Sequence, residues 1–171
     1  MAEESSSEPP LLPGQPNNRQ PPVDAVDREI LGLLAQDART TNAKVAELVG
    51  IAPSTALTRM RGLRERGVIK GFHADVDLSA LGWPLQVLIE IRLAVHTREQ
   101  IDAFTASVGS LPGVLMVFHV TGATDFLIWA AATDAQQLRE FVVEHLTTHP
   151  AVAHAETSLI YEYQRGPGVW G

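Results

Sequence analysis

The side chains best suited to chemistry in this sequence are hydroxyls and guanidiniums that recur between residues 53 and 70. The hydroxyls are Ser54, Thr55 and Thr58. The accompanying cations are Arg59, Arg61, Arg64, Arg66 and Lys70. Short polar side chains can reach base edges in the major groove of DNA, and arginine binds phosphates and guanine. The pattern favours a DNA-binding helix, and a solvated amphipathic helix is the plainer alternative.

The distribution of charge supports a nucleic-acid interface, although the whole chain carries a net charge of −7. Residues 24–73 have eight basic and six acidic side chains, whereas residues 74–171 have four basic and eleven acidic ones. A local positive patch attracts phosphate within a Debye length even on an acidic protein. The contrast predicts two domains with different tasks.

Composition narrows the function further. The chain has no cysteine, which excludes disulfides, thiolate catalysis and cysteine-ligated zinc. The sequence shows no signal-peptide pattern and no apolar run long enough to span a bilayer, so we expect a cytoplasmic, nucleoid-associated protein. Residues 1–22 are rich in Pro, Ser, Gln and Asn, which predicts a disordered tail.

The elements that must position the cationic segment are three short helices early in the chain. Asp24 is suited to cap the first helix, and Thr41 or Asn42 the second. Gly50 can adopt the left-handed conformation that ends a helix. Pro53 follows closely and suits the first turn of a third helix. This spacing is typical of a helix-turn-helix.

The third helix is predicted to run over residues 53–66 and to turn three apolar side chains toward the other helices, namely Ala56, Met60 and Leu63. Two short strands after it, with Lys70 and Gly71 near their turn, are predicted to form a β-wing. We therefore expect a winged helix-turn-helix domain over residues 23–75 and a linker over residues 76–83.

Residues 84–165 change to a different pattern, in which alternating apolar residues predict strands and capping boxes predict helices. Thr97 and Gln100 form one capping box, and Asp134 and Gln137 form the other. The predicted strands cover residues 85–93, 114–120, 126–132 and 151–163. The order β-α-β-β-α-β predicts an α+β fold of the ferredoxin-like kind. Residues 166–171 remain as a C-terminal tail.

The two central strands, VLMVFHV and FLIWAAA, are apolar on both faces. Helices are expected to cover one face of the sheet, so the other face needs a different cover. Packing of two sheets in a homodimer is the simplest way to hide it.

Residues 24 to about 165 resemble the leucine-responsive regulator/asparagine-regulator (Lrp/AsnC) family of transcription factors. The motifs that carry the resemblance are VDREILGLLAQDART, NAKVAELVGIAPSTALTRMRGLRERGVIKGF and VTGATDFLIWA. The resemblance implies a winged helix-turn-helix and a ferredoxin-like effector domain. It also implies dimers that assemble into rings, commonly octamers, which bind several operator sites in double-stranded DNA and respond to amino acids.

The chain departs from the family pattern at three places. Ala52 stands where the family usually has a serine before the proline of the recognition helix, and Gly62 stands where arginine is common. Loss of the serine cap costs about 1 kcal/mol of helix stability unless Ser54 caps a shorter helix. The third departure is in the turn between the middle strands, where the family favours Gly-Asp-x-Asp and this chain reads Gly-Ala-Thr-Asp.

The resemblance implies that this turn binds the effector through Gly122, Ala123, Thr124 and Asp125. Backbone groups at Gly122 would engage the carboxylate of an amino acid, and Asp125 would pair with its ammonium. Thr124 would replace part of the lost aspartate, and Thr157 on the last strand is a further candidate. An ordinary hairpin turn is the alternative without a ligand.

Two other classes of protein stay open at this point. An amino-acid-binding or adaptor module would lack affinity for DNA, and a small dimeric ferredoxin-like enzyme would need catalytic residues. His145 and His149 have the i, i+4 spacing of metal ligands, but no third ligand accompanies them. His119 lies in an apolar strand, and no nucleophile with a base is evident. We expect no enzyme activity, no metal and no cofactor.

Overall fold

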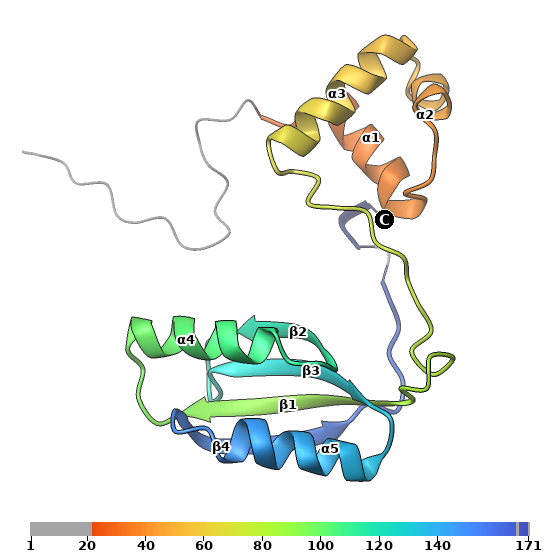
Figure 1. The fold of residues 1–171 in the computed structure, drawn as a ribbon. Coiled ribbons are helices and arrows are strands. Elements are labelled where there is room, and N and C mark those ends of the chain that lie inside the picture. The colour runs from red at the N-terminus through yellow and green to blue at the C-terminus, as the bar shows by residue number, and fades with distance from the viewer. Residues whose placement is uncertain (1–21, 167, 171) are drawn as a thin grey trace, which may run out of the picture. The chain divides into compact units, whose positions relative to one another are not determined.

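The computed structural model describes residues 22–166 and 168–170, which form two compact units that meet in sequence between Ala74 and Asp75 (Figure 1). Nearly all of the tail predicted over residues 1–22 lies outside the described residues. Within the predicted C-terminal tail, Gly168–Trp170 form a 3₁₀ helix, η2. Among the described residues, none of the helices is long and apolar enough to cross a membrane.

The N-terminal unit consists of three helices, α1 (Ala25–Gln36), α2 (Asn42–Val49) and α3 (Pro53–Glu65). Their termini follow the predicted capping chemistry. The Asp24 carboxylate accepts from the Asp27 amide at 2.8 Å, and the Thr41 hydroxyl accepts from the Lys44 amide at 3.2 Å. Gly50 ends α2 at a φ of 74°, where a side chain would be strained.

The core of this unit is small and apolar, and its buried members come from all three helices: Ile30, Leu34, Val45, Ala46, Ala56 and Leu63. Met60 packs against this cluster from α3, as predicted, and Ile69 packs there from the segment after α3. The apolar stripe of α3 therefore faces α1 and α2, which leaves its opposite face to the solvent.

The two strands predicted for the β-wing around Lys70 and Gly71 do not form: among the described residues, no strand occurs between the end of α3 and Leu85. The chain leaves α3 through Gly67, at a φ of 70°, and the Val68 and Ile69 amides donate to the Leu63 carbonyl. An isolated two-stranded hairpin is marginally stable, and the imperfect alternation here gives it no apolar face of its own.

The C-terminal unit has a four-stranded antiparallel sheet of order β2-β3-β1-β4. The strands are β1 (Leu85–Leu93), β2 (Val114–His119), β3 (Phe126–Ala132) and β4 (Val152–Leu159). The helices α4 (Arg98–Gly109) and α5 (Ala135–Phe141) pack on one face of the sheet (Figure 1). The predicted ferredoxin-like order is confirmed. However, β2 is an edge strand, and β1 and β3 are the central ones.

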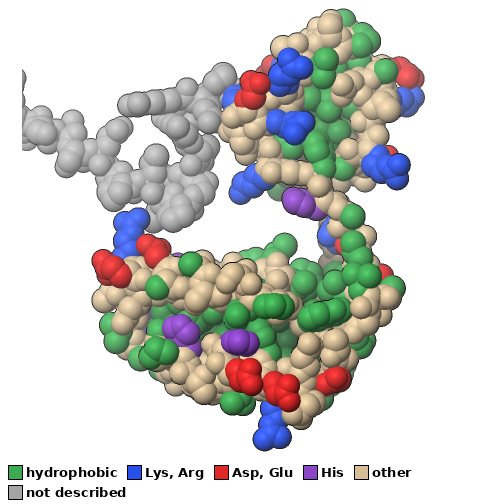
Figure 2. Space-filling model, in the orientation of Figure 1, with side chains coloured by type: hydrophobic (Ala, Val, Ile, Leu, Met, Phe, Trp, Pro, Cys, Tyr) green, Lys and Arg blue, Asp and Glu red, His purple; other side chains and the backbone are tan. Residues whose placement is uncertain are grey.

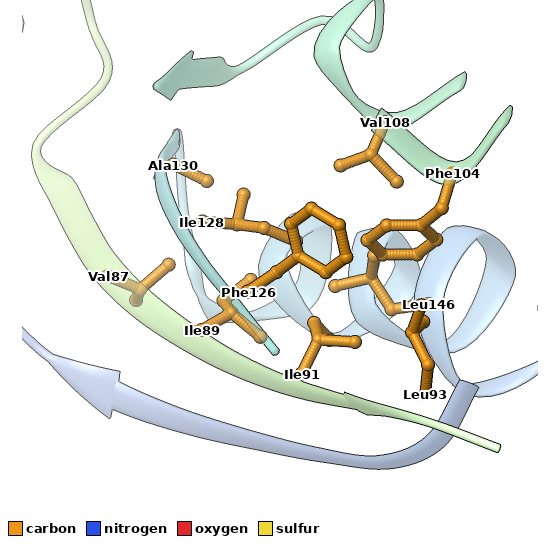
Figure 3. Close-up of a cluster of buried hydrophobic side chains, with 10 residues drawn as sticks. All are labelled: Val87, Ile89, Ile91, Leu93, Phe104, Val108, Phe126, Ile128, Ala130 and Leu146. Atoms are coloured by element: carbon orange, nitrogen blue, oxygen red, sulfur yellow. The ribbon is translucent and has the colours of Figure 1, made fainter. Parts of the chain in front are cut away.

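Ten buried apolar residues join the sheet to its helices (Figure 3). Phe104 of α4 meets Phe126 of β3 with ring centroids 4.9 Å apart. β1 presents every second residue to this core, and these are Val87, Ile89, Ile91 and Leu93. The alternation in the sequence therefore had a single physical cause, which is that one face of β1 is covered by α4 and α5.

The second helix of this unit differs from a regular α-helix. It continues from α5 into a π-helix, Val142–Thr147, in which the Thr147 hydroxyl donates to the Val142 carbonyl. The wider turn keeps Leu146 fully buried. The first capping box forms only in part, because the Gln100 amide donates to Thr97 while the Gln100 Oε1 has no partner among the described residues. In the second, the Gln137 amide donates to Asp134, and the Gln137 Oε1 accepts from the amide of Thr133, one residue before the cap.

Candidate DNA interface and effector turn

The outer face of α3 carries the hydroxyls and most of the cations that the sequence singled out. Six of them are exposed: Ser54, Thr55, Thr58, Arg61, Arg64 and Lys70. The structure brings them together as two groups. Arg61, Arg64 and Lys70 line one hollow, and the three hydroxyls lie with Arg59 around another. Figure 2 shows Lys and Arg side chains next to hydrophobic ones on the visible face of this unit.

Arg59 differs from the other predicted DNA contacts, because its guanidinium is held by α1. Its Nη1 lies 2.6 Å from the Asp24 Oδ2 and 2.9 Å from the Asp27 Oδ1. The hydrogen bonds that Arg59 donates to these two carboxylates raise the pKa of Arg59. Hydrogen bonds donated by the Asp27 amide and by Arg59 lower the pKa of Asp24. We therefore assign Arg59 to holding α3 against α1, and its removal is expected to disturb the fold.

Asp27 is the one buried charged residue among those that the structure describes, with 4% of its surface exposed. It accepts from Arg59 and also from the Arg66 Nη2, at 3.1 Å. Burial of a carboxylate is costly unless it is paired, and two guanidiniums meet that requirement here. Sequence reasoning missed this network, because Arg66 and Asp27 are 39 residues apart and only the fold joins them.

The N-terminus of α3 has no side-chain cap. The helix begins at Pro53, so Ser54 lies inside the first turn and does not cap a shorter helix. Ala52 supplies its carbonyl to the Ala56 amide at 3.0 Å but has no side-chain oxygen to offer. The amides at the start of α3 are therefore left to solvent or to an anionic partner, and helix N-termini favour anions.

The turn between β2 and β3 is fixed by contacts with β1. Gly122 has a φ of 126°, which a side chain would not tolerate well. The Arg92 Nε donates to the Ala123 carbonyl at 3.2 Å, and the Asp125 amide donates to the Ile91 carbonyl at 2.8 Å. Gly122 and Ala123 are exposed, whereas Thr124 is half-buried.

Asp125 is already engaged within the protein. Its Oδ2 accepts from the Leu93 amide at 2.7 Å, and its two oxygens lie 3.0 and 3.1 Å from the His96 Nε2. Burial would raise the pKa of Asp125, but the hydrogen bonds from Leu93 and His96 outweigh it and hold this pKa below its ordinary value. Pairing of Asp125 with a ligand's ammonium would therefore compete with His96, a neighbour that no sequence signal indicated.

The register of the sheet separates Thr157 from this turn. Thr157 pairs with Ile89, whereas Phe126, which follows the turn directly, pairs with Ile91. β4 and β3 lie on opposite sides of β1, so Thr157 is about 10 Å across the sheet from β3. Within one chain, Thr157 is not part of the cluster around the turn.

The histidines take part in packing. His119 stacks on Phe126, His145 contacts Phe141 edge-on, and His149 contacts Phe104 edge-on. No group of three or more His, Cys, Asp or Glu side chains suited to a metal ion occurs in the part of the chain that the structure describes. The spacing of His145 and His149 is thus accounted for by ring contacts.

Comparisons with known proteins agree with this arrangement. Residues 23–70 match the model of a winged helix-turn-helix DNA-binding domain, and residues 86–164 match that of the Lrp/AsnC ligand binding domain. The chain is 44% identical over 167 residues to the HTH-type transcriptional regulator AldR of Mycolicibacterium smegmatis, covering 97% of this chain and 98% of that protein. It is 37% identical over 137 residues to the leucine-responsive regulatory protein of Rhizobium meliloti, covering 80% and 88%.

Solved structures show the same fold. The crystal structure of MtbAldR is similar with a TM-score of 0.74 and 41% identity, covering 84% of this chain and 95% of that one. The structure of a transcriptional regulator from Neisseria meningitidis in complex with L-Met is similar with a TM-score of 0.77 and 30% identity, covering 85% and 94%. The chain belongs to the Lrp/AsnC family of DNA-binding transcription regulators.

Proposed function

We propose that this regulator recognises specific DNA sequences through the exposed face of α3 and that an amino acid modulates its binding. The single observation that carries the DNA part is the division of α3 into two faces. Its apolar stripe is buried on α1 and α2, and its hydroxyls are exposed together with Arg61 and Arg64. Ser54, Thr55 and Thr58 reach base edges, and Arg61 and Arg64 bind phosphate or guanine.

The test compares Arg61→Ala and Arg64→Ala with Arg139→Ala in a duplex-binding titration at several salt concentrations. Arg139 is an exposed arginine of α5, so it controls for the lost charge. A base contact is worth about 1–3 kcal/mol, and a phosphate contact lowers the salt slope by about one. We expect one of these losses for each α3 variant and neither for the control. Unchanged binding by both α3 variants would remove α3 from the interface.

For the effector, we propose the turn formed by Gly122, Ala123, Thr124 and Asp125. The positive φ of Gly122 and the exposure of Ala123 leave backbone groups accessible to a ligand carboxylate. Thr124 follows them in the turn and is half-buried. The Asp125 carboxylate holds the turn on β1 through the Leu93 amide and offers its remaining lone pairs to a ligand. The relative from Neisseria meningitidis in complex with L-Met supports an amino acid as the class of ligand.

Calorimetric titration with the amino acids, beginning with L-Met, tests this site. Thr124→Val and Asp125→Asn should each weaken binding, and Thr105→Val, on the exposed surface of α4, should leave it unchanged. Thr157→Val has a separate use. Since Thr157 lies two strands from β3 in its own chain, an effect of this variant would indicate that a second chain completes the site. Equal binding by all variants would exclude the turn.

We further propose that the chain forms a homodimer through the face of the sheet opposite α4 and α5, and that dimers assemble into an octamer. The register places several large apolar side chains on that face: Leu88, Met116, Phe118, Leu127 and Trp129. Met116 and Phe118 are 50% and 44% exposed. Exposed apolar patches of this kind are typical of interfaces. Sedimentation of Phe118→Asp, which should lose the dimer, tests the assignment.

A further inference from the structure

A hollow of about 800 Å³ lies beside α3 and combines two kinds of side chain that a DNA interface does not need together. Its cations are Arg61, Arg64 and Lys70, which outnumber the one acid of the lining, Glu65, and its apolar members include Leu57 and Phe72. Leu57 is 42% and Phe72 44% exposed, although both are large and apolar. Interfaces with DNA are polar and strongly charged, so the cations fit DNA but Leu57 and Phe72 do not.

The Phe72 ring lies next to one of the cations that line this hollow. The Arg64 guanidinium carbon lies 6.0 Å from the centroid of the Phe72 ring, within the range of a cation–π contact. A ligand that fits this hollow therefore has acidic groups for Arg61, Arg64 and Lys70, and apolar side chains for Leu57 and Phe72. A peptide with both features matches the hollow better than a nucleic acid alone does.

The chain contains such a peptide before its first helix. Residues 1–21 carry three acids, Glu3, Glu4 and Glu8, against the single cation Arg19. Leu11 and Leu12 are the only branched or aromatic apolar residues of this segment, and prolines flank them in PPLLP. Prolines restrict the conformations of an unbound peptide, and aromatic-lined grooves commonly bind proline-rich segments for that reason.

The N-terminal segment also enters the domain next to α3. Asp24, the cap of α1, is bound to Arg59 at the inner side of α3. The segment from Leu12 to Val23 can span up to about 35 Å when extended. α3 has 13 residues and is about 20 Å long, and a helix is about 10–12 Å wide. Leu11 and Leu12 can therefore reach the hollow on the outer side of α3.

We propose that residues 3–12 dock in this hollow of their own chain, with Leu11 and Leu12 against Leu57 and Phe72, and the three glutamates near the cations. This rests on the proposed function, because Arg61, Arg64 and Lys70 then serve both the segment and DNA. A tethered segment has an effective concentration in the millimolar range, so a contact with a Kd of about 1 mM is already half occupied.

The consequence is competition between the segment and DNA. The apparent affinity for DNA falls by the fraction of chains whose cations are available. Occupancies from one half to nine tenths weaken DNA binding about twofold to tenfold. The N-terminal segment thus lowers the affinity for every operator by the same factor, because docking and DNA binding exclude each other.

The first experiment detects docking of the N-terminal segment in the absence of DNA. Leu12 is replaced by the photoreactive p-benzoylphenylalanine in the full chain, and the cross-linked positions are mapped by mass spectrometry. We expect cross-links to α3 and to residues 69–72 within one chain, and their loss in the double variant Leu57→Ser/Phe72→Ser. Cross-links spread over the surface, or joining only different chains, would overturn the proposal.

The second experiment measures duplex affinity at fixed salt for three proteins: the native chain, Leu11→Ser/Leu12→Ser, and Glu3→Gln/Glu4→Gln/Glu8→Gln. Docking predicts a gain of about twofold to tenfold for both variants. A gain for the glutamine variant alone would indicate long-range repulsion of DNA and would contradict docking. If no protein binds DNA, the proposed function fails, and the cross-links still decide whether the segment docks.

Discussion

The interior of each unit of this regulator is stabilised by different interactions. The C-terminal unit buries ten apolar residues between a sheet and its helices, and none of its buried residues that the structure describes is charged. The N-terminal unit buries six apolar residues and also Asp27, whose carboxylate is paired with Arg59 and Arg66. The small unit therefore depends on a polar network that the large one does not need, because a small core supplies less apolar burial.

This difference divides the arginines of α3 by function. Arg59 points to α1 and completes the interior, whereas Arg61 and Arg64 are exposed and available for DNA. One helix thus supplies both a structural cation, Arg59, and the cations proposed to bind DNA, of which Arg61 is two residues away in sequence. Loss of DNA binding in an Arg59 variant would consequently report on folding as well as on contact.

The largest expected effect tests the apolar core. Phe104→Ala should destabilise the C-terminal unit by about 3–5 kcal/mol, because it removes a fully buried ring and leaves a cavity. Hydrogen exchange of the β1 and β3 amides measures it. Tyr161→Ala, at a position 95% exposed, should change the same amides little. Equal effects of the two variants would mean that the core does not dominate stability here.

The next effect tests the polar network. Asp27→Asn keeps the shape of the side chain but removes the charge shared by Arg59 and Arg66. We expect a loss of about 2–3 kcal/mol in the N-terminal unit, read from hydrogen exchange of α1 and α3. Glu29→Gln removes the same charge from the exposed side of α1 and serves as control. If the two variants match, the network adds nothing beyond net charge.

A smaller effect, of opposite sign, tests the uncapped start of α3. Ala52→Ser supplies the missing side-chain oxygen and should stabilise the N-terminal unit by about 1 kcal/mol. Thermal unfolding measures the gain. Ala43→Ser, inside the exposed first turn of α2, should give none. The new hydroxyl would also occupy an amide that a phosphate could use, so DNA affinity should rise less than stability.

The smallest expected effect is on the stability of the C-terminal unit at acidic pH. The folded-state pKa of Asp125 lies below its ordinary value, so the carboxylate stabilises the C-terminal unit above about pH 4. This contribution is lost as the pH falls through the lowered pKa. As the pH falls below about 4, native protein should therefore lose stability by an increment that is missing in Asp125→Asn. Identical acid profiles of the two proteins would show that Leu93 and His96 do not stabilise the charge.

Sequence patterns were sufficient to predict those helices and strands whose structure depends mainly on their own residues. The bounds of β1 agree with its alternating run and those of β3 with its continuous apolar run, and α1 and α2 begin after Asp24 and Thr41. The winged helix-turn-helix class was predicted correctly, but the two strands predicted for its wing do not form, because strand formation requires a partner, which imperfect alternation cannot guarantee. The π-helix after α5 also had no signal, since its wide turn depends on how Leu146 packs.

The sequence alone determined the order of helices and strands, the buried apolar stripe of α3 and the family. These features depend on caps, periodicity and turns, which act over a few neighbouring positions. Only the fold decided that Arg59 belongs to Asp24 and Asp27, that His96 meets Asp125, and that Thr157 lies away from the turn. These pairings join residues from different elements, or residues tens of positions apart, and their geometry is set by the packing of the elements that carry them.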